Sequence, residues 1–171
     1  MTVESEFLTF SVDKLRELIG RIETCVEKLT PEQVWARGSE NQNAVGNLLL
    51  HLDGNLRQWI LHGVGGQPDT RDRDSEFAAH DGAAARELSA RLRATVEEVA
   101  ALIGSLPPPR LLEPLTVQGY GVTVLGAIYH VVEHFAGHAF QIILMTKQFT
   151  GEDLGFYAHL SGAKSRTNPL P

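Results

Sequence analysis

Four long segments of the chain repeat hydrophobic residues at steps of three and four, which is the period of an amphipathic helix. These segments cover about residues 7–29, 44–62, 82–106 and 123–149. Between the first two, Thr30 and Gln33 have the spacing of a capping box, and Pro31 suits a first helical turn. The pattern therefore predicts four long helices and one short extra helix after the first.

The sequence contains little sign of strands. Only the stretch PLTVQGYGV, residues 114–122, looks extended, and its glycines suit a connection better than a sheet strand. Four amphipathic helices without a strand framework predict an all-α fold, a four-helix bundle. Residues 63–81 and 107–122 are long enough for crossovers, so the helices need not be ordered sequentially in space. The length of 171 residues predicts one domain over residues 1–171, with 157–171 as a tail.

Composition narrows the class of protein. Hydrophobic residues make up 43% of the chain and charged residues 21%, which is typical of a soluble globular protein. The net charge is −6 and no basic run is present, so neither nucleic acid nor an anionic membrane is an expected partner. No signal-peptide pattern opens the chain, and Cys25 is the only cysteine. We expect a cytoplasmic protein in which Cys25 is a core residue.

The fourth segment carries three histidines at intervals of four. His130, His134 and His138 share one stripe of the predicted helix with Gln141, at the edge of its apolar face. Two imidazoles one turn apart can converge on one metal ion, about 2.0–2.1 Å from each nitrogen. One helix cannot complete such a site, and His51 on the second helix is the candidate third ligand. Three imidazoles would leave one or two positions open for water or substrate.

The same histidines also allow a simpler interpretation. A histidine near an apolar face is often only hydrogen-bonded to a carbonyl group, and short motifs produce many false matches. Two observations favour metal. Three unpaired buried imidazoles would cost free energy, and Gln141 and the asparagines near His51 could orient ligands. The residues do not distinguish zinc from nickel, iron or manganese, because all of these accept imidazole.

The stretch HFAGHAFQI, residues 134–142, resembles the fourth-helix motif of the DinB-like (DinB/YfiT-like) superfamily of metal-binding four-helix bundles. That motif falls on His134, His138 and Gln141. The stretch LLLHLDGNLRQWI, residues 48–60, is similar to the second-helix motif that supplies the third ligand, here His51. An uncharacterised branch of the superfamily is more similar still, through RDRDSEF at residues 71–77. The resemblance covers about residues 10–157.

This resemblance implies an open divalent site on His51, His134 and His138, with zinc or nickel as the ion, in a protein that forms homodimers. Characterised members imply a thiol-dependent transferase, in which the ion holds a low-molecular-weight thiol co-substrate as thiolate. The catalytic residues stay unassigned, with Gln141 and His130 as candidates for orienting a ligand, supporting the site or relaying protons.

The chain also departs from the family pattern. Phe140 replaces a small residue and could crowd the mouth of the site, and Gly137 stands where many members have a larger residue. The ending from His159 onward also differs, so His159 is given no role.

Three functions are compatible with these residues. The first is a metal-dependent transferase, or related enzyme, that acts on a small molecule. The alternative is a non-catalytic metal-binding or stress-associated protein with a structural or sensing site. The third is a structural dimer whose histidines satisfy each other through water. Arg71 and Arg73 could bind an acidic substrate, although a solvated loop with internally paired charges is the preferred interpretation.

Overall fold

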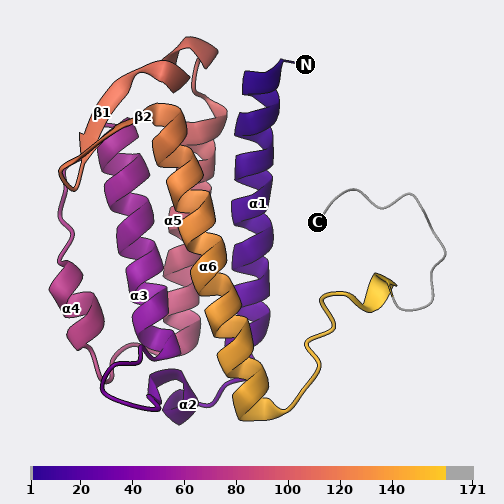
Figure 1. Cartoon of the computed structure of the whole chain (residues 1–171). Coiled ribbons are helices and arrows are strands. Elements are labelled where there is room, and N and C mark those ends of the chain that lie inside the picture. Colours follow the sequence, from indigo (N-terminus) through magenta and orange to yellow (C-terminus); the bar gives the residue numbers. More distant parts are fainter. Residues whose placement is uncertain (1, 161–171) are drawn as a thin grey trace.

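A computed structural model describes residues 2–160 of the chain, and Figure 1 shows four long helices lying side by side. Helix makes up 69% of the structure and strand 5%, so the predicted all-α class is confirmed. None of the helices in the described part of the chain is long and apolar enough to cross a membrane. The long helices are α1 (Val3–Val26), α3 (Val45–Leu56), α5 (Ala85–Gly104) and α6 (Val124–Thr150).

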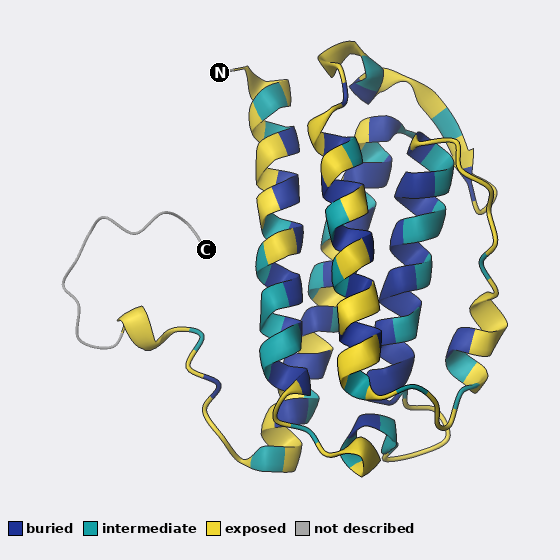
Figure 2. Cartoon of the chain, turned by 180° about the vertical axis from the view of Figure 1, so that it is seen from behind, coloured by how far each residue is buried: buried dark blue, intermediate teal, exposed yellow. Residues whose placement is uncertain are grey.

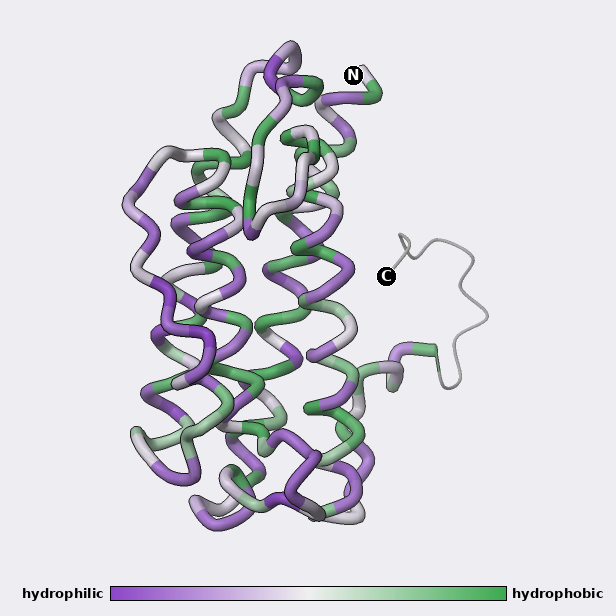
Figure 3. Tube along the Cα trace, turned by 60° about the vertical axis from the view of Figure 1, so that its left-hand side comes forward, coloured by the Kyte–Doolittle hydropathy of each residue, from purple (hydrophilic) through white to green (hydrophobic). Residues whose placement is uncertain are grey.

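The core lies where these four helices face one another. Helix α1 packs on α5 and α6, and α3 packs on the same two helices. Buried residues follow the inner face of each helix and exposed residues the outer face (Figure 2). The hydropathy of the chain alternates in the same way (Figure 3). The predicted apolar stripes are therefore the surfaces that pack. The largest fully buried side chains include Phe135, Leu15, Ile19, Leu52, Ile60, Leu92 and Ile103.

The short extra helix is present as α2 (Pro31–Trp35). Thr30 accepts a hydrogen bond from the backbone N–H of Gln33, and the Gln33 side chain accepts one from the backbone N–H of Thr30. The predicted capping box is thereby confirmed. Such a box is predictable because all of its contacts lie within four residues.

The second predicted helix is longer and less regular than the pattern suggested. Helix α3 continues without a break into a π-helix, η1 (Arg57–Val64). The backbone N–H of Gly65 donates to the carbonyl of Ile60, five residues back, at 2.8 Å. Trp59, Ile60, Leu61 and Val64 are buried in this π-helical part.

Residues 114–123 form a β-hairpin, so the prediction of a mere connection was wrong. Strand β1 (Pro114–Val117) pairs antiparallel with β2 (Tyr120–Thr123). Gln118 and Gly119, at the turn, have φ angles of 52° and 80°. Two consecutive positive φ values are typical of the tight turn that joins hairpin strands. Gly119 therefore lies at a turn position that favours glycine, and its presence does not argue against strands on either side of the turn.

The connection between η1 and α5 also contains a helix that the sequence pattern missed. Helix α4 (Arg73–Ala78) lies beside α3 (Figure 1), and Asp72 caps it by accepting from the backbone N–H of Ser75. Two short 3₁₀ turns, η2 (Pro108–Leu112) and η3 (Ala158–Leu160), complete the described elements. Of the expected tail, residues 161–171 lie outside the described residues.

Candidate metal centre

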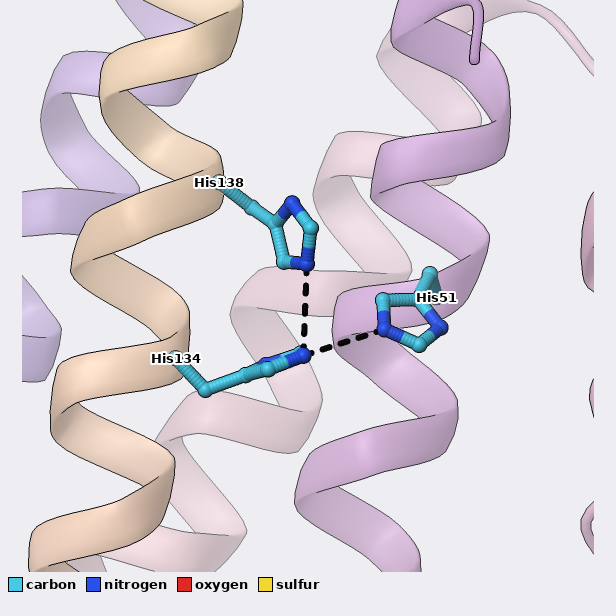
Figure 4. A group of neighbouring side chains, drawn as sticks. All are labelled: His51, His134 and His138. Atoms are coloured by element: carbon cyan, nitrogen blue, oxygen red, sulfur yellow. Dashed lines mark hydrogen bonds between the residues drawn. The ribbon is translucent and has the colours of Figure 1, made fainter. Parts of the chain in front are cut away.

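Three histidine side chains from two helices converge between α3 and α6 (Figure 4). The Nε2 atom of His134 lies 3.1 Å from Nε2 of His51 and 3.2 Å from Nε2 of His138. The three side chains offer ligand atoms that all lie within 4.8 Å of one another. The structure therefore brings together the three residues that the sequence singled out, and this cluster could hold a metal ion.

The positions of the three side chains follow from the helices that carry them. His134 and His138 are one turn apart on α6, so their rings project from the same face. His51 lies on α3, which packs against α6 at this level. His51 is buried, whereas His134 and His138 are partly exposed. The cluster is thus closed toward the core and open toward the outside of α6.

Proton counting supports a cation as the shared partner of these nitrogens. Nε2 of His134 has two imidazole nitrogens within hydrogen-bonding distance, and one proton can serve only one of them. A tetrahedral ion with nitrogen ligands at about 2.0–2.1 Å would hold them about 3.3–3.4 Å apart. The donor set and its spacing therefore fit a divalent ion.

The far side of the His51 ring is held by a carboxylate. Its Nδ1 donates to Oε2 of Glu76 at 2.9 Å, which leaves Nε2 unprotonated and facing the other histidines. Arg71 binds the same carboxylate with two hydrogen bonds, Nε to Oε1 at 2.7 Å and Nη2 to Oε2 at 2.8 Å. Nη2 of Arg71 also lies 3.0 Å from Nδ1 of His51, because both donors point at one carboxylate oxygen.

The other two rings are held differently. Nδ1 of His138 donates to Oε1 of Gln141 at 2.9 Å, so Nε2 of this ring is also directed at the cluster. Nδ1 of His134 is buried and has no hydrogen-bond partner among the described residues. Two of the three histidines are therefore held in the tautomer that metal binding needs.

Burial favours the uncharged form of His134 and His138. It lowers the pKa of His134 to about 3, and the neighbouring His138 and His51 act in the same direction. Burial also lowers the pKa of His138, against the hydrogen bond with Gln141. Burial would raise the pKa of Glu76, but the hydrogen bonds from Arg71 and His51 outweigh it and hold that pKa below its usual value. At neutral pH His134 and His138 are therefore neutral, and the carboxylate of Glu76 is charged.

A hollow of about 330 Å³ opens over the cluster on the outer face of α6. His134, His138, Gln141 and Gly137 line it, and a Cβ atom added to Gly137 would meet nothing within 4 Å. Phe140 is half exposed and is not among the lining residues, so the expected crowding of the mouth is not observed. A small molecule can therefore approach the histidines from this side.

His130 lies one turn from the cluster and does not join it. Its ring packs on Trp59, with ring centroids 4.0 Å apart, and its centroid is 5.6 Å from that of His134. It also lines the hollow, together with Glu133. Burial lowers the pKa of His130. His130 is thus placed beside the open side of the cluster, without a side-chain hydrogen bond among the described residues.

The segment RDRDSEF pairs charges internally, as the preferred interpretation held, but it is partly buried and contains a helix, so it is not a solvated loop. The Arg71 side chain is 3% exposed and forms an ion pair with Glu76. Arg73 lies over the ring of Phe77, 4.8 Å from its centroid. Sequence reasoning noticed the arginines of this segment and missed Glu76. The available sequence signal was Gly54, a glycine inside an amphipathic helix soon after His51. A glycine at such a place indicates that another group packs closely against the helix there.

Comparison with known proteins places the chain in a family. A family model described as a protein of unknown function (DUF1572) matches residues 2–164. The search of curated proteins gives no match. The family match includes the three clustered histidines, Glu76 and Gln141. Since the match spans nearly all of the sequence, the chain belongs to the DUF1572 family.

Proposed function

We propose that this protein is a DinB-like four-helix bundle that binds one divalent metal ion through His51, His134 and His138. The convergence of three imidazole nitrogens, with neighbouring distances of 3.1 and 3.2 Å, is the observation that carries the proposal. The resemblance of the second and fourth helices to the superfamily motifs supports it independently. Zinc or nickel as the ion, a homodimer and a cytoplasmic location belong to the same proposal and rest on that resemblance.

The proposed reaction is attack of a thiol sulfur on an electrophilic carbon of a small molecule. It forms a C–S bond, breaks the bond from that carbon to its leaving group, and passes the thiol proton to the leaving group. When bound, the metal would supply a Lewis acid that lowers the pKa of a thiol or water in its open position. Residues of the chain would orient the rings, admit the substrate and move the proton. Glu76 and Gln141 hold His51 and His138 in their tautomers, and the hollow over Gly137 admits the substrate. His130 and Glu133, at the wall of the hollow, are the groups placed to take or return a proton.

A second candidate function is non-catalytic metal binding, for stability or for sensing. The position of the cluster favours it, because an ion held by His51 and the two histidines of α6 would link α3 to α6. Under this proposal the open position would hold water only. A large metal-linked gain in stability would accompany it, with no turnover of any thiol.

Elemental analysis of tag-free protein tests the metal site. We expect about one zinc or nickel ion per chain in the native protein and none in His134→Ala, since His134 is the central nitrogen of the cluster. Metal-loaded protein should then be mixed with glutathione, mycothiol or bacillithiol and a test electrophile. Metal-dependent consumption of a thiol would support the transferase. A loaded protein that consumes none of them would leave the second candidate.

A further inference from the structure

Gly54 occupies a position in α3 where glycine is unfavourable unless something requires it. It lies inside the helix, three residues after His51, and glycine destabilises a helix interior relative to alanine. A Cβ atom at Gly54 would lie 2.1 Å from Oε1 of Glu76 and 2.9 Å from Nε of Arg71. The missing side chain thus makes the space in which these two charged groups sit against α3.

The Arg71–Glu76 pair that fills this space is buried and fully engaged. The two side chains are 3% and 8% exposed, and both carboxylate oxygens accept from Arg71. The remaining guanidinium nitrogen, Nη1, donates to Oε1 of Gln58 at 3.0 Å. A buried ion pair contributes little net stability by itself, because desolvation offsets the attraction. Its position behind His51 therefore calls for another explanation.

The segment that carries the pair is fastened to α3 mainly by polar contacts. The Asn47 side chain donates to the backbone carbonyls of Glu76 at 2.9 Å and Ala79 at 2.8 Å. The ring of Phe77 packs on His51, with centroids 4.8 Å apart. A cleft of about 570 Å³ lies along the same segment and is also lined by Gly54, Arg71 and Glu76. The pair thus lies between this cleft and the His51 ring.

We propose that Gly54, Arg71 and Glu76 form a positioning unit that sets the metal affinity of the centre by holding the Nδ1–H of His51. The inference rests on the proposed three-histidine site. By linkage, a group that favours metal binding is itself held more firmly when metal is bound. Metal binding should therefore hold residues 71–79, which carry the pair and its contacts to α3, more firmly, and the contacts of this segment should in turn set how tightly the ion is held.

Gly54→Ala tests the unit without altering a ligand or a charge. The added methyl group must displace Glu76 from His51, and we expect zinc affinity to fall by about 10- to 100-fold. Gly20→Ala is the matched control. Gly20 also lies inside a long helix, but a Cβ there would meet only Nη2 of Arg93, at 3.7 Å. Its zinc affinity should equal that of the wild type in a competition titration with a chromophoric chelator.

Glu76→Gln provides a second variant, which keeps the shape of the side chain and removes its charge. This variant should also lower zinc affinity by about 10- to 100-fold, because the His51 N–H then faces a neutral acceptor and Arg71 loses its charged partner. Hydrogen exchange tests the unit without altering it. Backbone amides of residues 71–79 should exchange more slowly with zinc than without it in the wild type, and His134→Ala should show no such difference.

The outcomes separate this inference from the metal site itself. Wild-type protein that takes up no zinc would overturn both. If the wild type binds zinc and the two variants bind it equally tightly, the positioning unit is wrong and the metal site stands. The positioning unit is also wrong if Gly54→Ala lowers only the stability of the metal-free protein, because that is the result of a purely structural role.

Discussion

At the scale of single residues, His134 is the central member of the cluster. Its Nε2 lies 3.1 Å from Nε2 of His51 and 3.2 Å from Nε2 of His138. Its Nδ1 is buried without a hydrogen-bond partner among the described residues, so the polar contacts of this ring are those with the other two histidines. His51 and His138 each have a hydrogen-bond partner that directs Nε2 inward. The site therefore depends on one poorly solvated imidazole held between two oriented ones.

His134→Ala should abolish zinc binding, whereas His130→Ala should retain it. The His130 ring packs on Trp59, outside the cluster, although His130 and His134 lie on the same stripe of α6. Isothermal titration of tag-free protein with zinc measures the difference. Retained binding in His134→Ala together with lost binding in His130→Ala would show that the ligands had been assigned to the wrong histidines.

The pKa of His134 also predicts how the stability of the metal-free protein depends on pH. An unfolded histidine titrates near 6.5, and the folded one near 3. Above pH 6.5 both states are neutral and the group has no effect. As the pH falls from about 6.5 toward 3, only the unfolded state takes up the proton, so the free energy of unfolding decreases.

The measurement is urea unfolding across this pH range, with His134→Gln as the control because glutamine does not titrate. As the pH falls through this window, the free energy of unfolding of the wild type should decrease progressively relative to that of His134→Gln. A difference that stays constant with pH would mean that His134 is not held neutral in the folded protein.

At the scale of elements, two local caps were predictable and the distant contact behind His51 was not. The capping box of α2 and the cap of α6 at Thr123 join residues three apart, and the sequence alone indicated both places as helix starts. The bond between His51 and Glu76 spans 25 positions and depends on the packing of α4. Periodicity contains no information on such a contact, so Glu76 was missed while the histidines were found.

The packing of α2 on α3 gives a prediction at this scale. A Cβ atom at Gly46 would lie 2.7 Å from the ring of Trp35, so Gly46→Ala should displace α2. We expect a loss of about 1–3 kcal/mol in the free energy of unfolding, as in other overpacked cores. Gly20→Ala, where the space is free, should be neutral or stabilising by up to about 1 kcal/mol. Equal stability of the two variants in urea would contradict this packing.

At the scale of the whole molecule, the site joins two of the four long helices. Helix α3 contributes His51 and α6 contributes the other two histidines, while α5 packs on α3 and α1 packs on α6. The hydrophobic pattern was sufficient to predict the four helices, including the two that carry the clustered histidines. It could not predict the π-helical turn, the hairpin or α4, because these depend on local turn geometry and on polar contacts across the chain.

An ion that links two helices should stabilise the entire fold. At a free zinc concentration about 1,000 times the dissociation constant, binding to the folded state alone adds about 4.1 kcal/mol. For a chain of this size the melting temperature should rise by roughly 8–16 °C. Differential scanning calorimetry with zinc and with excess chelator measures the shift, and His134→Ala should show none. An equal rise in the melting temperature of that variant would show that zinc binds at another site.

The coordination of the ion is the most direct test of the three-histidine centre. X-ray absorption spectroscopy of tag-free protein loaded with one zinc ion per chain reports the identity and distance of its ligands. We predict three imidazole nitrogens at about 2.0–2.1 Å, with one or two further light atoms from solvent. A sulfur ligand at about 2.3 Å, or fewer than two imidazoles, would contradict the proposed centre.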